Sequence, residues 1–216
     1  MKRLFALLIL ALVGTFAASA ACAQSDMAQR YAACLAQVRP TEVHDLLQAT
    51  SADAASMRYH ALSDDDRCFG RVFGDKQFRP QDASFSVDVL RGDLAEQELE
   101  AQAERVAALQ PLPLQQKRYI RPWFAATGRN PAVDEMGACM ADTDPAGIIG
   151  LIRTTPGTTD ESNAISGMST ALTKCLSAGM RLDASRGALR AALADALYQR
   201  LSNPALSLAQ VLPASK

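Results

Sequence analysis

The sequence predicts an all-helical protein made of two repeated multi-helix units, and two observations predict it. Apolar residues recur at helical spacing, whereas long strand-like alternation of apolar and polar residues is absent. In addition, two stretches repeat each other around paired cysteines: Cys34 and Cys139 each have a second cysteine a similar distance further along, at Cys68 and Cys175. An internal repeat of this length indicates duplicated helical units that share one architecture.

The first residues of the chain predict export. Lys2 and Arg3 precede an apolar run over residues 4–13, and the small residues that follow end in Ala21-Cys22-Ala23. This is the pattern of a secretory signal peptide, so we expect residues 1–23 to be removed. An uncleaved membrane anchor and a lipoprotein acylated at Cys22 are the alternatives. Cleavage would leave a mildly acidic chain with an even number of cysteines.

The even number of cysteines predicts disulfides, because an exported chain meets an oxidising environment. The four remaining cysteines allow three pairings, which sequence does not separate in general. A duplicated unit that folds independently should carry its own bridge, and this favours Cys34 with Cys68 and Cys139 with Cys175. Each bridge would close a loop of about 35 residues, worth roughly 4 kcal/mol in chain entropy. Structural zinc sites use closely spaced cysteine pairs instead, so we expect no metal and no cofactor.

The first two helices of each unit follow from the residues around the first cysteine. One helix is expected around Cys34 and its counterpart around Cys139. The next helix is expected to start at Pro40 and at Pro145, since proline suits the first helical position, with Asp144 as an N-cap. Apolar residues stand at identical offsets from the first cysteine in both units: Val43, Leu46 and Leu47 in one, and Ile148, Leu151 and Ile152 in the other.

The last two helices of each unit close the repeat. In the second unit a stripe from Ile165 to Leu176 predicts one helix, opened by a capping box of Thr158 and Glu161 and ended by Gly179. The closing helix is expected to follow Asp-Ala-Ser in both units, with Asp82 and Asp183 as N-caps.

The two closing helices carry small residues at equivalent positions. Gly92 should cost its helix about 1 kcal/mol relative to alanine, and its counterpart is Ala191, which is also small. A helix crossing too close for a larger side chain would explain both residues, and chance in an alanine-rich chain is the alternative.

The chain divides into five parts: a signal peptide (1–23), a first unit (24–110), a linker (111–132), a second unit (133–203) and a tail (204–216). The linker contains the only tryptophan, together with other aromatic residues and several cations. Because Trp, Tyr and Arg are enriched at binding hot spots, the candidate interaction residues are Arg118, Tyr119, Arg121, Trp123, Phe124 and Arg129. The alternative is that Trp123 and Phe124 fill the contact between the two units.

No catalytic site can be assembled from the sequence. The only histidines are His44 and His60, and His44 stands beside Asp45, but adjacent helical residues point to different faces. The acidic run at 64–66 fits a solvated turn. No glycine-rich phosphate loop and no Cys-x-x-Cys motif occurs, and a mildly acidic chain has no electrostatic reason to bind nucleic acid.

The repeated motif, a Cys pair followed by a Leu-Arg-Gly/Ala-x-Leu-Ala-Glu/Asp helix, resembles uncharacterised exported alpha-helical proteins of Gram-negative bacteria. The resemblance spans residues 28–105 and 133–200 and implies no activity, substrate or catalytic residue. We therefore expect a periplasmic or secreted, non-enzymatic protein that offers an interaction surface to a protein partner, without membrane association after cleavage. A cell-envelope hydrolase and a holdase-type chaperone are the alternatives.

Overall fold

The computed structural model describes residues 26–63, 65–74, 86–114, 119–176, 182 and 184–206. All regular secondary structure in these residues is helical, as the sequence predicts. Several predictions fall outside the described residues: the signal peptide, the N-caps Asp82 and Asp183, the stop at Gly179, and Arg118 of the linker.

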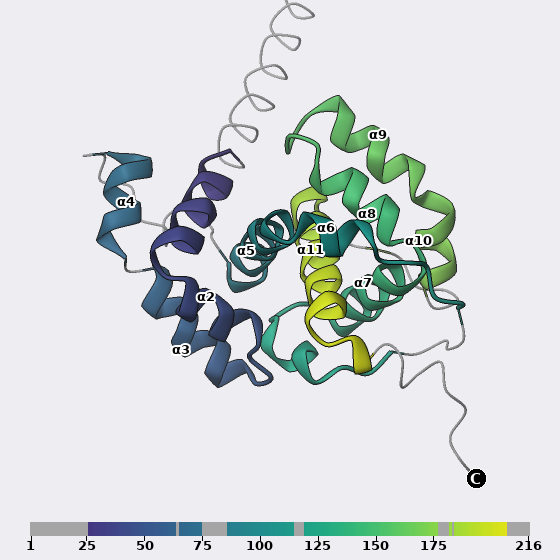
Figure 1. The fold of residues 1–216 in the computed structure, drawn as a ribbon, viewed down its shortest axis with the longest axis horizontal. Coiled ribbons are helices and arrows are strands. Elements are labelled where there is room, and N and C mark those ends of the chain that lie inside the picture. The colour runs from purple at the N-terminus through teal and green to yellow at the C-terminus, as the bar shows by residue number, and fades with distance from the viewer. Residues whose placement is uncertain are drawn as a thin grey trace, which may run out of the picture.

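The first half of the chain forms a series of helices that ends in a long one (Figure 1). A helix over residues 26–38 is followed by α2 (Pro40–Leu47), α3 (Ala52–Ser63), α4 (Asp66–Phe73), α5 (Val87–Ala101) and the short α6 (Ala103–Ala107). Pro40 occupies the first turn of α2, as predicted.

The second half follows the same order of helices after the short 3-10 helix η2 (Pro122–Ala126). Its helices are α7 (Pro131–Thr143), α8 (Pro145–Ile152), α9 (Thr159–Gly167), α10 (Ser169–Cys175) and α11 (Arg186–Ser202). Asp144 caps α8 as predicted, since its carboxylate accepts a hydrogen bond from the Gly147 N–H at 2.9 Å.

The stripe that ends at Leu176 is divided between two helices rather than lying on one. The break at Met168, between α9 and α10, directly follows Gly167, a poor helix former. The capping box also differs in detail: the Thr158 hydroxyl accepts from the Glu161 N–H, but the Glu161 carboxylate accepts from the Gly157 N–H at 2.9 Å instead of from Thr158.

Each half is closed by one disulfide, with the predicted pairing. Cys34 bonds Cys68 with a Cα separation of 5.6 Å, and Cys139 bonds Cys175 with a Cα separation of 5.5 Å. The first bridge joins the helix over 26–38 to α4, and the second joins α7 to α10. The two bridges therefore tie equivalent helices of the two halves.

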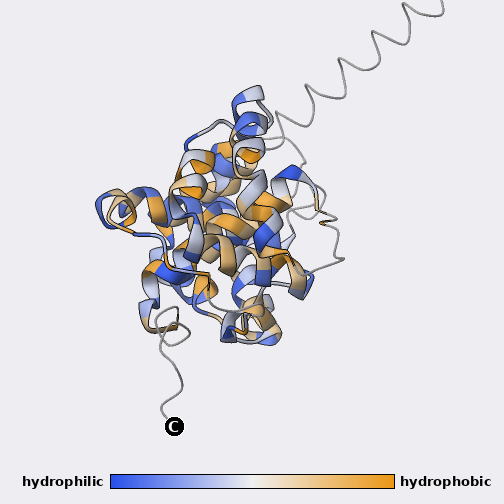
Figure 2. Cartoon of the chain, turned by 90° about the vertical axis from the view of Figure 1, so that its right-hand side faces the viewer, coloured by the Kyte–Doolittle hydropathy of each residue, from blue (hydrophilic) through white to orange (hydrophobic). Residues whose placement is uncertain are grey.

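The two closing helices, α5 and α11, pack against each other at the centre of the molecule (Figure 1). Their backbones come so close that a Cβ atom on Gly92 would lie 2.2 Å from the Ala191 Cα. The predicted close crossing is confirmed, and any residue larger than glycine at position 92 would collide with the α11 backbone. Figure 2 shows hydrophobic and hydrophilic residues interspersed along the helices of the molecule. α5 and α11 are themselves buried on all sides over residues 90–96 and 189–201.

Candidate functional site

The most distinctive site in the structure is a network of buried arginines around the α5–α11 crossing. Arg91 on α5 is completely buried. Its Nε donates to the Asp195 carboxylate on α11 at 2.7 Å, and its Nη atoms donate to the carbonyls of Leu46 and Leu47 at the end of α2. Carbonyls at a helix C-terminus lack partners within the helix, so a cation there satisfies hydrogen bonds and complements the helix dipole.

Arg190 on α11 makes the corresponding contacts in the other half. Its Nε and Nη2 donate to the two carboxylate oxygens of Glu96 on α5 at 2.7 and 2.8 Å. Its Nη atoms also donate to the carbonyls of Leu151 and Ile152 at the end of α8, at 3.1 and 2.9 Å. Each closing helix therefore supplies an arginine that the other closing helix neutralises.

The two sets of contacts correspond position by position in the repeated motif. Arg91 and Arg190 are equivalent, as are Glu96 and Asp195, and the capped carbonyls belong to equivalent residues. That gene duplication produced this correspondence stays a prediction.

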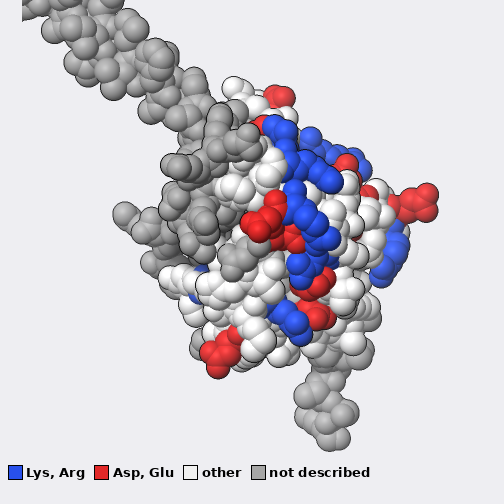
Figure 3. All heavy atoms as spheres, turned by 90° about the vertical axis from the view of Figure 1, so that its left-hand side faces the viewer, with Lys and Arg blue, Asp and Glu red and all other residues white. Residues whose placement is uncertain are grey.

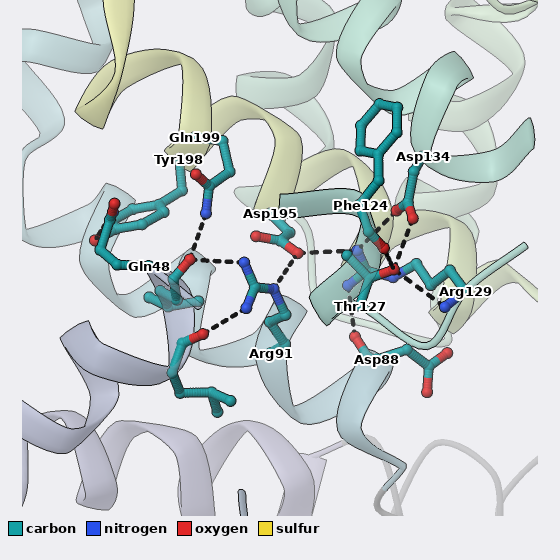
Figure 4. Close-up of polar contacts among 12 residues, drawn as sticks. Gln48, Asp88, Arg91, Phe124, Thr127, Arg129, Asp134, Asp195, Tyr198 and Gln199 are labelled. Carbon is teal, nitrogen blue, oxygen red and sulfur yellow. Dashed lines mark hydrogen bonds and ion pairs between the residues drawn. The ribbon is translucent and has the colours of Figure 1, made fainter. Parts of the chain in front are cut away.

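The linker is joined to the same network by the hydrogen bonds and ion pairs of Arg129 (Figure 4). The Arg129 side chain is 3% exposed, and its Nη1 donates to Asp195 at 2.9 Å and to Asp134 on α7 at 3.3 Å. Its Nη2 donates to the Asp88 carbonyl on α5 at 2.7 Å, and the Thr127 hydroxyl donates to Asp134 at 2.6 Å. Asp195 thus lies between two guanidinium groups, one from α5 and one from the linker.

Burial shifts the acidity of the carboxyl groups in this region. Burial raises the pKa of Asp134 to about 6, although Arg129 and the Thr127 hydroxyl favour the ionised form. Burial likewise raises the pKa of Glu96, against the opposing effect of Arg190. Asp93 is buried with a raised pKa, first because of desolvation and then because Glu96 is near. Within the described residues, its Oδ2 atom has no hydrogen-bond partner.

The aromatic candidates of the linker are buried or half-buried. Trp123 is 3% exposed and Tyr119 6%, while Phe124 is half-buried with its ring centroid 4.6 Å from that of Trp123. Arg121 is buried too, with its guanidinium 3.3 Å from Asp142 on α7 and 5.2 Å from the Tyr119 ring centroid. These side chains therefore lie in the interior and not on an exposed interaction surface. For Trp123 and Phe124 this agrees with the alternative that they fill the contact between the two units.

The linker packs between the two halves. The helix η2 contacts α3 of the first half, and Arg121 pairs with α7 of the second. A cavity of about 10 Å³ lies beside Trp123 and Arg121, which is room for roughly one water molecule. Among the described linker residues, the exposed large apolar side chains are instead Leu114, at 48%, and Ile120, at 79%.

The histidines make no contact that resembles a catalytic pair. The His44 Nδ1 lies 3.4 Å from the Tyr198 hydroxyl, and the neighbouring Asp45 pairs with Arg58 at 3.1 Å. The ring of His60, which is exposed, lies against that of Tyr59. Within the described part of the chain, no group of histidine, cysteine and acidic residues could hold a metal ion.

The expectation of a solvated acidic turn at 64–66 is wrong for Asp65, which is only 6% exposed. Its carboxylate caps α4 by accepting from the N–H groups of Arg67 and Cys68. It also pairs with the side chains of Arg67 at 2.8 Å and Arg39 at 3.0 Å, and Arg67 in particular holds the pKa of Asp65 far below its usual range.

The ion pairs of Asp65 belong to a charged band on the side of the molecule that carries α3 and α4. Figure 3 shows Lys and Arg side chains there with Asp and Glu side chains between them. Because these arginines lie close to carboxylates, the band is not an uncompensated positive patch.

No protein-family model, curated protein or solved structure matches the chain. The resemblance to exported helical repeat proteins therefore stays a prediction. Of the helices described, none combines the length and the apolar character that crossing a membrane requires.

Sequence reasoning identified the Leu-Arg helices but missed what their charged residues do. Arg190 and Asp195 stand within an otherwise apolar stretch, and Arg91 and Glu96 stand at the equivalent positions of the first motif. A charged residue that recurs on a buried face signals a buried partner, because an unpaired charge in the interior is too costly. The partner itself lies in the other half, where spacing along the sequence does not reveal it.

Proposed function

We propose that this chain is an exported, non-enzymatic helical protein that acts by binding a protein partner in the periplasm or outside the cell. The observation that carries the proposal is the use of the buried charges: the arginines and carboxylates of the central network join helices and cap helix ends. Arginines and carboxylates that are paired in this way stabilise a rigid scaffold and do not act as an acid, a base or a nucleophile on a substrate.

Export is supported by the cysteines and by the first residues of the chain. Two disulfides within one chain are compatible with an oxidising compartment, since thiols remain reduced in most cytosols. The signal-peptide pattern over residues 1–23 points to the same compartment.

The interaction surface is proposed to lie around Ile120 rather than at Trp123. Ile120 is 79% exposed and Leu114 is 48% exposed, and the two residues flank the basic pair Lys117 and Arg118 in the sequence. A large apolar side chain that is exposed next to cations suits a contact with an apolar and acidic protein surface.

The test compares capture of partners by three forms of the chain in periplasmic extract of the native host. We expect the wild-type protein to retain a partner and the Ile120→Ser variant to retain at least tenfold less of it. Met57→Ser is the matched control, since Met57 is 67% exposed on α3, and it should behave as wild type. Trp123 is unsuitable for this test, because truncating a buried tryptophan costs about 3–5 kcal/mol of stability. Equal capture by all three forms, or capture by none, would contradict the proposal.

A further inference from the structure

A cavity lies beside the arginine network and shares one residue with it, Glu96. It lies between the start of the helix over 26–38, the second half of α5, α6 and the end of α8, and its volume is about 450 Å³. Small-molecule sites typically fall between about 300 and 1,000 Å³. The cavity therefore has the size of a ligand site, unlike the small void beside Trp123.

One wall of the cavity is apolar. It consists of Leu99 on α5, Val106 on α6, and Ile149 and Ile152 on α8. Leu99 and Val106 are buried, while the two isoleucines are half-buried. Because Leu99 is only 1% exposed and Val106 3%, the apolar surface that a ligand group would cover belongs mainly to Ile149 and Ile152.

The inner end of the cavity is polar and already organised. The Glu96 carboxylate lies there, held by two hydrogen bonds from Arg190 and one from the Gln29 side chain at 3.1 Å. Arg190 also pairs with Glu161 at 3.5 Å, so the Glu96 carboxylate shares its guanidinium and adds a partial negative charge to this end of the cavity. The inner end is therefore fixed in place before any ligand arrives.

The outer part of the cavity carries two opposite charges that the protein itself does not use. Glu100 on α5 and Arg153 at the end of α8 both line the cavity and are both exposed. Among the residues that the structure describes, neither one forms an ion pair. One spare carboxylate and one spare guanidinium suit a ligand that carries one positive and one negative group.

The volume sets the size of that ligand. A cavity of about 150 Å³ holds benzene, with six carbon atoms, so by proportion about 450 Å³ holds roughly 18 non-hydrogen atoms. A dipeptide of two apolar amino acids has about this many atoms and carries an ammonium group and a carboxylate at its ends.

We propose that this cavity binds a short apolar peptide of about dipeptide length with free termini. The ammonium group of the peptide pairs with Glu100, its carboxylate pairs with Arg153, and its side chains cover Ile149 and Ile152. Guanidinium and carboxylate groups form strong, bidentate hydrogen bonds, so Arg153 fixes the orientation of the peptide. This site is separate from the surface around Ile120 and does not depend on it.

The test is titration calorimetry of the full, disulfide-bonded chain with leucyl-phenylalanine. We expect saturable binding, which the N-acetylated and C-amidated form of the same dipeptide weakens at least tenfold. Glu100→Gln and Arg153→Gln should each weaken binding of the free dipeptide about tenfold or more. Ile149→Trp should abolish binding by filling the cavity, whereas Arg71→Gln on the exposed face of α4 should leave it unchanged.

Three results would overturn this proposal. The first is no saturable heat from the free dipeptide at millimolar concentration. The second is equal binding of the blocked dipeptide, which would show that the charges play no part. The third is equal binding of phenethylamine, which has no carboxylate, since the site would then recognise only a cation. Helical circular dichroism of each variant verifies that the fold is intact, and Glu100 and Arg153 are exposed, so their replacement should preserve it.

Discussion

At single residues, burial raises the pKa of a carboxyl group and pairing with a cation lowers it. Asp195 accepts hydrogen bonds from both Arg91 and Arg129, whereas Asp134 receives only the weaker, 3.3 Å contact from Arg129 together with the Thr127 hydroxyl. Burial therefore outweighs pairing at Asp134 and raises its pKa to about 6.

The raised pKa of Asp134 predicts a stability that increases as the pH falls from 7 toward 4. The folded protein takes up a proton near pH 6, whereas the unfolded chain does so only near its ordinary value of 3.8. Because the folded state binds the proton first, the free energy of unfolding rises through this window, by about 3 kcal/mol at most. Urea unfolding at pH 7.5 and pH 5 measures the rise.

The control for this prediction is Asp134→Asn, which keeps a side chain of the same shape but cannot ionise. Glu96 and Asp93 also have raised pKa values, so both proteins should gain stability on acidification. The gain between pH 7.5 and pH 5 should be smaller in the variant by about 1.4 kcal/mol, because pH 5 lies one unit below the folded pKa of about 6. An identical gain in the two proteins would show that Asp134 does not titrate in this window.

At the scale of elements, the close crossing of α5 and α11 determines which side chains fit at position 92. In most helices a change of glycine to alanine is favourable by about 1 kcal/mol, because alanine is the better helix former. At Gly92 the added Cβ would lie 2.2 Å from the Ala191 Cα, which is backbone and cannot rotate away. The two long helices would have to separate to admit one methyl group.

Two substitutions of the same kind should therefore change the stability in opposite directions. Gly92→Ala should lower the free energy of unfolding by about 1–3 kcal/mol, since overpacking forces the helices apart. Gly150→Ala in α8, where nothing lies within 4 Å of the added Cβ, should raise it by up to about 1 kcal/mol. Chemical denaturation of both variants tests the pair, and a stabilising Gly92→Ala would mean that the crossing is looser than described.

The helix starts, the disulfides and the helix crossing show which parts of the fold the sequence predicted. Pro40, Pro145 and Asp144 marked helix starts correctly, because proline and N-cap preferences are local. The expectation that the two units are repeats led to the correct disulfide pairing. Of the two explanations for the small residues Gly92 and Ala191, the structure bears out the close crossing.

Other features depend on contacts that sequence spacing does not reveal. The contact of Asp65 with Arg39 was missed, since Arg39 precedes α2 and α3 in the sequence, whereas the capping of α4 by Asp65 and its pair with Arg67 are local. The salt bridge of Arg190 with Glu96 joins residues far apart in the chain, and the burial of Trp123 depends on helices from both halves. Such contacts exist only once the helices have packed.

At the scale of the whole molecule, the halves are interdependent although each has its own disulfide. The arginine that caps α2 is neutralised by a carboxylate of the second half, and the arginine that caps α8 is neutralised by a carboxylate of the first. Glu161 of the second half also pairs with Arg190, at 3.5 Å, and Arg129 also pairs with Asp195, at 2.9 Å. Loss of Glu96 or of Arg91 would therefore leave a buried charge with only part of its compensation, and full loss of a buried partner typically costs about 3–5 kcal/mol. The two halves should therefore unfold together as one cooperative unit.

Native-state hydrogen exchange of the Glu96→Gln variant, followed by mass spectrometry, tests this cooperativity most directly. Glu96 lies on α5 of the first half, but its partner Arg190 holds the end of α8 in the second. If the halves are one unit, the slowest amides of α2 and of α8 lose protection by the same factor relative to wild type. Loss of protection confined to one half, with the other unchanged, would contradict the account.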